Sequence, residues 1–510
     1  MKLWLYLTAL SLSIWAACGL ANPQALALDY TPGDAIARAP QNHTPPAILQ
    51  QSLANSTYLA LSLEEAIFLA LRYSPDVENA ELQRVVDKYN LALSYYNFDV
   101  QYKISGSTLT TINQSEPRTS SSTIAPQATI KTPLGTSITL AQDNNYNTGE
   151  GQTGAWQPTV SLSLEQPLIS GFGTEYNLIS LANAQDSEII NRMTMRDTIA
   201  NAISTVINSY LQLIQNNNDL QTNIASYEAD KITVEIDKAL INAGRKAATD
   251  VATAEAQVAS DQLSILTQKN TISNSMQTLV NNIGLKPGTK IQVPADVEVI
   301  FTPIPDLKES IELALKNNTT YQNSLMRLKS LERQLYQDQQ DALPELDLVA
   351  TTRYGNNDGS QSSTLGNLGE TTTLNNSIGL NLNIPIDNFN DKALIQQDLV
   401  AIQQQKIQIR QQRESIEITI INDINNLTSG METVKQSLVA VKLQEQAQEN
   451  LVAKGKFGLA STIDITNGQQ LLNTARQQVI QNKIRYLQNL TQFYMDLGVL
   501  LEKWNIGLRY

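Results

Sequence analysis

The sequence predicts an α+β protein in which one structural unit occurs twice, each copy consisting of a helix, a β-hairpin, a long helix and a shorter helix. Residues 61–80 align with 305–324 at an offset of 244, with seven identical positions. Repeats of this length mark a supersecondary unit that the chain uses more than once. The expected organisation is a first repeat at 61–285, a linker at 286–304, a second repeat at 305–501 and a tail at 502–510.

An amphipathic helix is expected to open each repeat, at 61–96 and at 305–341. Ser62 and Asp306 precede the apolar pattern and are the natural N-caps. Glu65 stands three residues after Ser62, which is the spacing of a capping box. Both repeats therefore carry a defined helix start.

A region rich in Thr, Ser and Gly follows each opening helix, at 98–170 and at 343–387. Apolar and polar residues alternate there with the two-residue period of a strand. The first region accounts for most of an excess of about 30 residues over the second copy, and its stretches 112–127 and 143–157 are expected to be surface loops. The alternating runs are 103–110, 128–142, 159–167, 343–355 and 376–385.

One hairpin per repeat would supply about four strands per chain, and four strands cannot close a barrel. Open strand edges are not tolerated in lipid. The chain is therefore either soluble, or several copies share one barrel. Three copies would supply about twelve strands, an even number of the kind that outer-membrane barrels use.

A long helix is expected next in each copy, near 176–241 and 391–453. Apolar residues recur there in steps of four and three, the spacing of a coiled coil. Sixty or more residues make a rod of roughly 90–100 Å. The returning helices, 250–284 and 464–501, are about half as long. If the opening and returning helices stack end to end, together they match the length of the long helix.

Residues 1–21 have the features of a signal peptide, with one lysine before a mostly apolar run and small residues before a cleavage point that could fall as late as residue 27. Cys18, the only cysteine, stands in a stretch close to a bacterial lipoprotein signal. However, Trp15 occupies a position where that signal takes Leu, Val or Ile. Lipidation of Cys18 and its removal with the signal both stay open.

Composition narrows the classes of function. The net charge of −13 argues against a nucleic-acid partner. The sole histidine, His43, lies in an expected extended segment at 28–60, and the sequence has no Gly-rich phosphate loop, metal-spaced cluster or nucleophile elbow. We therefore expect no enzyme activity, no cofactor and no metal site. No apolar run after the signal reaches about 18 residues, so a spanning part would have to be a closed β-barrel.

Four pieces in duplicated order resemble the TolC-like outer membrane efflux protein family over nearly the whole mature length. They are LSLEEAIFLALRYSPD at 61–76, SLEQPLISGFG at 163–173, the turns GRKAATD and GLASTID, and RYLQNLTQFYMDLGVLLEKW at 485–504. The resemblance implies a homotrimer in the outer membrane of a Gram-negative bacterium, with a twelve-stranded β-barrel in lipid continuing into a periplasmic α-helical barrel.

The resemblance also implies the function of an exit duct. Such proteins serve tripartite efflux or type I secretion, as passive conduits from the periplasm to the exterior. They dock a periplasmic adaptor (membrane fusion) protein and an inner-membrane pump of the RND, ABC or MFS type. The alternative that the residues leave open is a soluble periplasmic coiled-coil scaffold, in which the alternating strands would have no lipid face.

In this family the two turns between long and returning helices form the periplasmic tip, where acidic residues line the aperture. Asp250 and Asp464 match acidic gate positions, and Asn467 stands where some relatives carry a second acid. Gly455 and Ala460 replace the tyrosine and arginine with which some relatives latch the tip. The alternative for each aspartate is a helix cap, and the two roles can coexist.

The tip turns themselves carry glycine and basic residues. Gly244 and Gly458 are expected to permit the tight reversal of the chain. Arg245, Lys246, Lys454 and Lys456 cluster around the two turns. These basic residues are either solvated turn charges or contacts for the hairpin tip of an adaptor.

Overall fold

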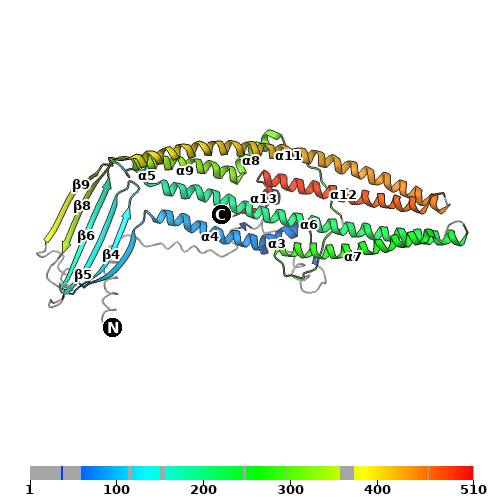
Figure 1. Cartoon of the computed structure of the whole chain (residues 1–510), viewed down its shortest axis with the longest axis horizontal. Coiled ribbons are helices and arrows are strands. Elements are labelled where there is room, and N and C mark those ends of the chain that lie inside the picture. Colours follow the sequence, from blue (N-terminus) through cyan, green and yellow to red (C-terminus); the bar gives the residue numbers. More distant parts are fainter. Residues whose placement is uncertain are drawn as a thin grey trace.

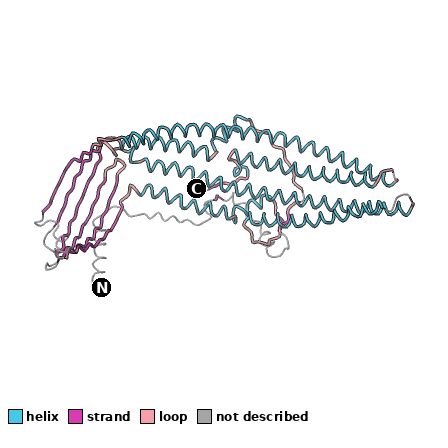
Figure 2. Tube along the Cα trace, viewed as in Figure 1, coloured by secondary structure: helices cyan, strands magenta, loops and turns pink. Residues whose placement is uncertain are grey.

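The computed structural model describes residues 36–37, 59–112, 118–149, 155–244, 249–294, 296–355, 373–457 and 459–508. The predicted signal, Cys18, His43 and most of the segment 28–60 lie outside these residues. Figure 1 shows an elongated molecule with a six-stranded sheet at one end and helices that run from it to two hairpin tips at the other. Figure 2 shows that strands and long helices occupy separate ends.

Each opening segment forms two helices, where a single helix was expected. α3 (Leu63–Tyr73) and α4 (Pro75–Tyr96) meet at Ser74, and α8 (Leu307–Asn317) and α9 (Thr319–Asp341) meet at Asn318. The first break arises because a residue before proline avoids the helical conformation. At the second break the Asn318 side chain accepts a hydrogen bond from the Tyr321 backbone N–H at 2.9 Å, which caps α9.

The helix starts are as predicted. Ser62 caps α3, and its capping box with Glu65 is complete, because each side chain accepts a hydrogen bond from the other residue's backbone N–H. Asp306 caps α8 by accepting from the backbone N–H groups of Lys308 and Glu309. Such caps contribute about 1 kcal/mol each.

The helices of one chain lie in four parallel rows. α6 (Ile179–Asn242) and α11 (Phe389–Lys456) each form a whole row and run the full length of the helical part of the molecule. α7 (Thr249–Ile283) continues the row of α3 and α4, and α12 (Thr462–Asp496) continues the row of α8 and α9 (Figure 1). The expected end-to-end stacking is confirmed. α12 stops before the expected end at 501, and a short α13 (Leu500–Lys503) follows it.

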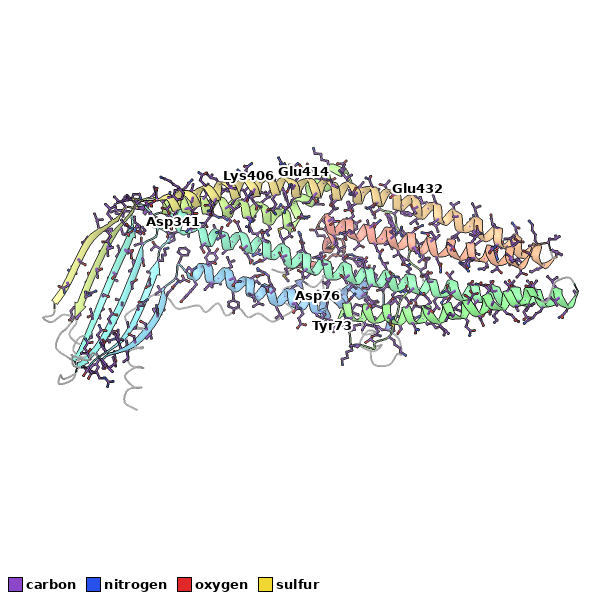
Figure 3. The ribbon with its side chains drawn as sticks, in the orientation of Figure 1. Tyr73, Asp76, Asp341, Lys406, Glu414 and Glu432 are labelled. Carbon is purple, nitrogen blue, oxygen red and sulfur yellow. The ribbon has the colours of Figure 1, made fainter. Side chains whose placement is uncertain are left out.

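A glycine stands at the joint in each interrupted row. Gly284 follows α7 with φ 83°, and a Cβ atom there would overlap the carbonyl oxygen of Tyr73. Tyr73 is the last residue of α3 and is labelled in Figure 3. Gly498 follows α12 with φ 69°, and its Cβ would lie 2.6 Å from the Cβ of Asn317. The breaks at Ser74 and Asn318 are therefore where a returning helix abuts an opening one.

The hydrophobic core lies along α6. Ile199, Ile203, Val206, Tyr210 and Leu213, which follow the predicted steps of four and three, are all buried. They pack against the opening and returning helices on either side, mainly α3, α7 and α12. Burial of an aliphatic side chain contributes about 1.5–3 kcal/mol, so this seam holds the rows together.

The sheet corrects the strand count. It has six strands in the order β3-β4-β5-β6-β8-β9, all antiparallel, where four per chain were expected. The stretches 112–127 and 143–157, expected as loops, contribute much of β4 and β5 and the start of β6. The strands are β3 (Gln101–Thr111), β4 (Thr119–Lys131), β5 (Ser137–Gly149), β6 (Ala155–Pro167), β8 (Glu345–Gly355) and β9 (Thr373–Asn383).

Small elements complete the fold. α5 (Thr174–Asn177) joins the sheet to α6. β1 (Ile36–Ala37) pairs with β10 (Gly507–Leu508), and β2 (Leu59–Ala60) pairs with β7 (Ile291–Gln292). Among the described residues, none of the helices combines the length and apolar character needed to cross a bilayer.

Candidate gate at the helical tips

The two turns predicted to form the tips lie at the same end of the molecule (Figure 1). At the α6–α7 turn, Gly244 has φ 67° and donates its N–H to the Ile241 carbonyl at 2.9 Å, as a helix-ending glycine does. Arg245 and Lys246 lie outside the described residues. Asp250 is the second residue of α7, and its side chain is not among those described.

At the α11–α12 turn, Asp464 is fixed by a capping box. Ser461 is the N-cap, and both its backbone N–H, at 2.9 Å, and its hydroxyl, at 2.6 Å, donate to Oδ2 of Asp464. The hydroxyl of Ser461 in turn accepts from the Asp464 N–H. These bonds from Ser461 hold the pKa of the Asp464 carboxyl below its ordinary value. The carboxylate is thus a cap, and it also remains exposed to solvent.

The other predicted residues of this tip face solvent. Asn467 is exposed on α12, three residues beyond Asp464. Lys454 and Lys456 are exposed in the last turn of α11, where a cation suits the negative end of the helix dipole. Gly458 lies outside the described residues. The α11–α12 tip therefore combines an exposed anion with two exposed cations within a few residues.

Gly455 has a packing role that was not predicted from the sequence. It is buried in the last turn of α11, and a Cβ atom there would overlap the side chain of Ile465 on α12. Gly468 on α12 makes a similar approach to Gln448 and Leu451 on α11. Two glycines, one on each helix, thus allow α11 and α12 to cross closely below the tip.

A buried polar seam between the two hairpins was also missed. Thr462, at the start of α12, donates to the carboxylate of Asp237 on α6 at 2.9 Å from each oxygen. Farther from the tip, Asn473 donates to Ser226 on α6 at 2.8 Å. The sequence contained a signal for this seam, because the four-and-three spacing of buried positions on α6 continues toward the tip with polar side chains. These buried positions are Ser226, Asp230, Thr233 and Asp237.

Each hairpin also contains a pair of aspartates between its long and returning helices. Burial first, and then the neighbouring carboxyl of Asp261 on α7, raise the pKa of Asp230 on α6 to about 7. Burial and the neighbouring Asp496 on α12 likewise raise the pKa of Asp423 on α11 to about 7. Such pairs share a proton below neutral pH and repel each other above it.

A family model described as "Outer membrane efflux protein" matches residues 310–499. The outer membrane protein TolC of Escherichia coli is 24% identical over 331 residues, which are 62% of this chain and 63% of that protein. The chain thus aligns with somewhat less than two thirds of this relative.

Solved structures share the fold. VceC of Vibrio cholerae superposes with a TM-score of 0.64 at 15% identity, over 87% of this chain and 96% of that one. The CmeC outer membrane channel of Campylobacter jejuni gives 0.62 at 14% identity, with 86% of each chain covered. At this level of identity the likeness shows a common architecture, in which helical hairpins end in an antiparallel sheet.

The solved outer-membrane proteins VceC and CmeC share this architecture of strands and helical hairpins. The family match and the TolC relatives make this chain similar to the TolC-like outer membrane efflux proteins, and they support a location in the Gram-negative outer membrane. These findings support an exit channel and do not favour the soluble scaffold.

Proposed function

We propose that the chain is the exit duct of a tripartite efflux or type I secretion system, acting as a passive conduit from the periplasm to the exterior. One observation carries the proposal: a sheet with one apolar face stands at one end of four helical rows, and an exposed, capped carboxylate stands at the other. In this proposal three copies surround one axis, the strands stand in outer-membrane lipid and the tips lie deep in the periplasm.

At the tip, Asp464 and Asp250 would gather into two rings of three carboxylates around the axis. Crowded carboxylates attract cations and repel anions. The hydrogen bonds from Ser461 lower the pKa of the Asp464 carboxyl and so favour its charged form. Asn467 would line the same aperture without charge. We assign these three residues to the gate.

Opening such a tip requires the hairpin α6–α7 to move relative to α11–α12. The bond from Thr462 to Asp237 joins the two hairpins directly behind the tip and is therefore part of what keeps the tip closed. This bond supplies a closed-state contact in a chain that carries glycine and alanine at the family's latch positions.

The exposed basic residues suit a docking role. Lys454 and Lys456, together with Arg245 and Lys246 on the other turn, would meet the hairpin tips of a periplasmic adaptor, through which an inner-membrane pump of the RND, ABC or MFS type is coupled.

The test is conductance in planar lipid bilayers. The pore is expected to prefer cations, and Asp464→Asn should weaken block by multivalent cations at least several-fold, because three charges leave the aperture together. Asp306→Asn is the matched control, since it alters a capping aspartate far from the tip. Unchanged block in Asp464→Asn would reject the gate role, and recovery of the mature protein in the soluble periplasm would reject the duct.

A further inference from the structure

The hairpin β4–β5 has no counterpart in the second repeat. β3 and β6 of the first copy correspond to β8 and β9 of the second, and β4 and β5 stand between β3 and β6 both in sequence and in the sheet. Because strands alternate in direction, one hairpin can be inserted without changing the direction of any other strand. The excess length of the first repeat is therefore a strand pair.

The β4–β5 hairpin is an integral part of the sheet, and contacts at its turn hold it in place. Its turn, 132–136, lies against the segment that leads from β6 to α5. Gly135 has φ 95°, and a Cβ atom there would lie 2.7 Å from the Gly171 carbonyl oxygen and 3.0 Å from Pro167. The Gly173 N–H donates to the Leu134 carbonyl at 3.2 Å, and the Thr136 hydroxyl donates to the Gln166 side chain.

The cross-strand pairing gives β4 and β5 the same two faces as the rest of the sheet. On one face, Ile138 and Leu140 of β5 stand opposite Leu164 and Leu162 of β6. On the other face, the Thr129 and Thr139 hydroxyls are 3.1 Å apart, and the Thr123 hydroxyl of β4 donates to the Asn145 side chain of β5 at 2.5 Å. A strand pair with an apolar face and a hydroxyl-rich face has the pattern of a barrel wall, with lipid on one side and water on the other.

The same apolar face continues to both edges of the sheet. On β3 it presents Tyr102 and Ile104, and on β9 it presents Ile378, Leu380 and Leu382, all of them exposed. The two edge strands are 11 residues long each and run in opposite directions, since five antiparallel pairings connect them. The β9 edge can therefore pair antiparallel with the β3 edge of a second copy. The apolar faces of the two sheets then lie on the same side.

We propose that three copies close one ring of eighteen strands, six from each chain, in which β3 of one copy pairs with β9 of the next. This inference rests on the three-copy duct proposed above. It adds that β4–β5 is part of the wall and that the two neighbouring copies cover the two free edges, one edge each.

The width of the six-stranded sheet and the width of the four helical rows agree with this ring. Strands about 4.8 Å apart and tilted by about 40° cover roughly 37 Å with six strands, but only about 25 Å with four. Helices packed about 8–10 Å apart cover roughly 32–40 Å with the four rows of one chain. With six strands, each copy contributes a similar arc to both layers, so the sheet continues the helical wall at nearly the same radius.

Cysteine crosslinking tests the neighbours of β3. Ser105 and Ala125 are register partners on β3 and β4. In native membranes treated with an oxidant, Ser105→Cys with Ala125→Cys should form a disulfide within the chain. Ser105→Cys with Ser161→Cys or Ser163→Cys on β6 should not, because two strands separate these positions. The unaltered chain, whose only cysteine is Cys18, is the control.

A second pair reports on the boundary between copies. Ser105→Cys with Ser377→Cys or Gly379→Cys on β9 should give covalent dimers and trimers on denaturing gels, because both strands would meet there with the same face inward. If β3 instead crosslinks to β6 and not to β4, each copy contributes four strands, and the ring of eighteen is wrong while the duct stands. If no pair joins two copies and the protein migrates as a monomer, the three-copy duct fails as well.

Discussion

The two repeats of the chain differ far more in their strands than in their helices. Both have an opening helix broken once, a long helix of more than 60 residues, a 35-residue returning helix and a glycine at the joint. The first repeat nevertheless has four strands and the second has two. Helix lengths are constrained because all four rows pack side by side, whereas a sheet accepts extra strands provided that they come in pairs.

The largest difference between the repeats should appear at a buried ion pair that only one of them has. Arg84 on α4 is 1% exposed, and its Nη1 lies 2.7 Å from Oε2 of Glu188 on α6. At the offset of 244, position 328 is leucine. Arg84→Ala should lower the free energy of unfolding by about 3–5 kcal/mol, because it leaves Glu188 buried without its principal partner.

Thermal unfolding of the purified protein in detergent measures this loss. The matched control is Arg333→Ala, which breaks the more exposed pair with Asp186. It should cost about 1 kcal/mol or less. Equal losses for the two variants would mean that burial does not set the value of the first pair.

The second-largest difference in stability between the repeats is expected at the glycines of the two joints, Gly284 and Gly498. Gly284→Ala should destabilise the chain by about 2–4 kcal/mol, because its Cβ would meet backbone atoms that cannot move away. Gly498→Ala should cost about 1–2 kcal/mol, because its Cβ would meet the side chain of Asn317. Denaturant titration of both variants provides the comparison.

Gly288→Ala isolates the backbone contribution to these losses. Gly288 has φ 88°, and a Cβ atom there would have no neighbour within 4 Å, so its substitution reports the cost of the left-handed conformation alone, about 1 kcal/mol. A loss at Gly284 no larger than the loss at Gly288 would show that the joint is not closely packed.

The smallest expected difference between the repeats is in how their buried aspartate pairs make the free energy of unfolding depend on pH. The folded pKa of Asp230, about 7, exceeds its ordinary value of 3.8, so the folded state holds this proton longer than the unfolded state does. Stability should therefore fall as pH rises from about 4 to about 7 and stay low above that range. Asp261→Asn removes the repulsion and should raise the free energy of unfolding at pH 8 by about 1–2 kcal/mol.

The pair of Asp423 and Asp496 in the second repeat should show the same effect of pH to a smaller extent. Asp230 and Asp261 are 4% and 8% exposed, whereas Asp423 and Asp496 are less deeply buried. Asp496→Asn should therefore give a smaller gain at pH 8, and both gains should vanish near pH 4. A gain that persisted at pH 4 would indicate a packing effect and not relief of charge.

The sequence was sufficient for the features that depend on short-range periodicity. The capping residues Ser62 and Asp306, the bounds of the long helices and the end-to-end stacking all followed from spacing and length. The breaks at Ser74 and Asn318 were missed, because they serve a contact with a helix more than 170 residues away along the chain.

Hydroxyl-rich strands and the candidate gate were harder to predict. β4 and β5 contain many Ser, Thr and Asn residues, and this composition favours a loop interpretation because it makes one face of these strands as polar as a loop. The bond from Thr462 to Asp237 joins residues 225 positions apart, so no local pattern could pair them. The cap at Asp464, by contrast, could be anticipated from the sequence, although its partner Ser461 was not singled out.

Because of the joints at Gly284 and Gly498, two of the four helical rows are interrupted and two are continuous. Only α6 and α11 are covalently continuous from the sheet to the tips, while the other two rows are interrupted near mid-length and held across the gap by contact alone. We expect a movement of the tips to be accommodated at these two joints, where helices only abut, whereas the uninterrupted α6 and α11 must bend or move as whole helices.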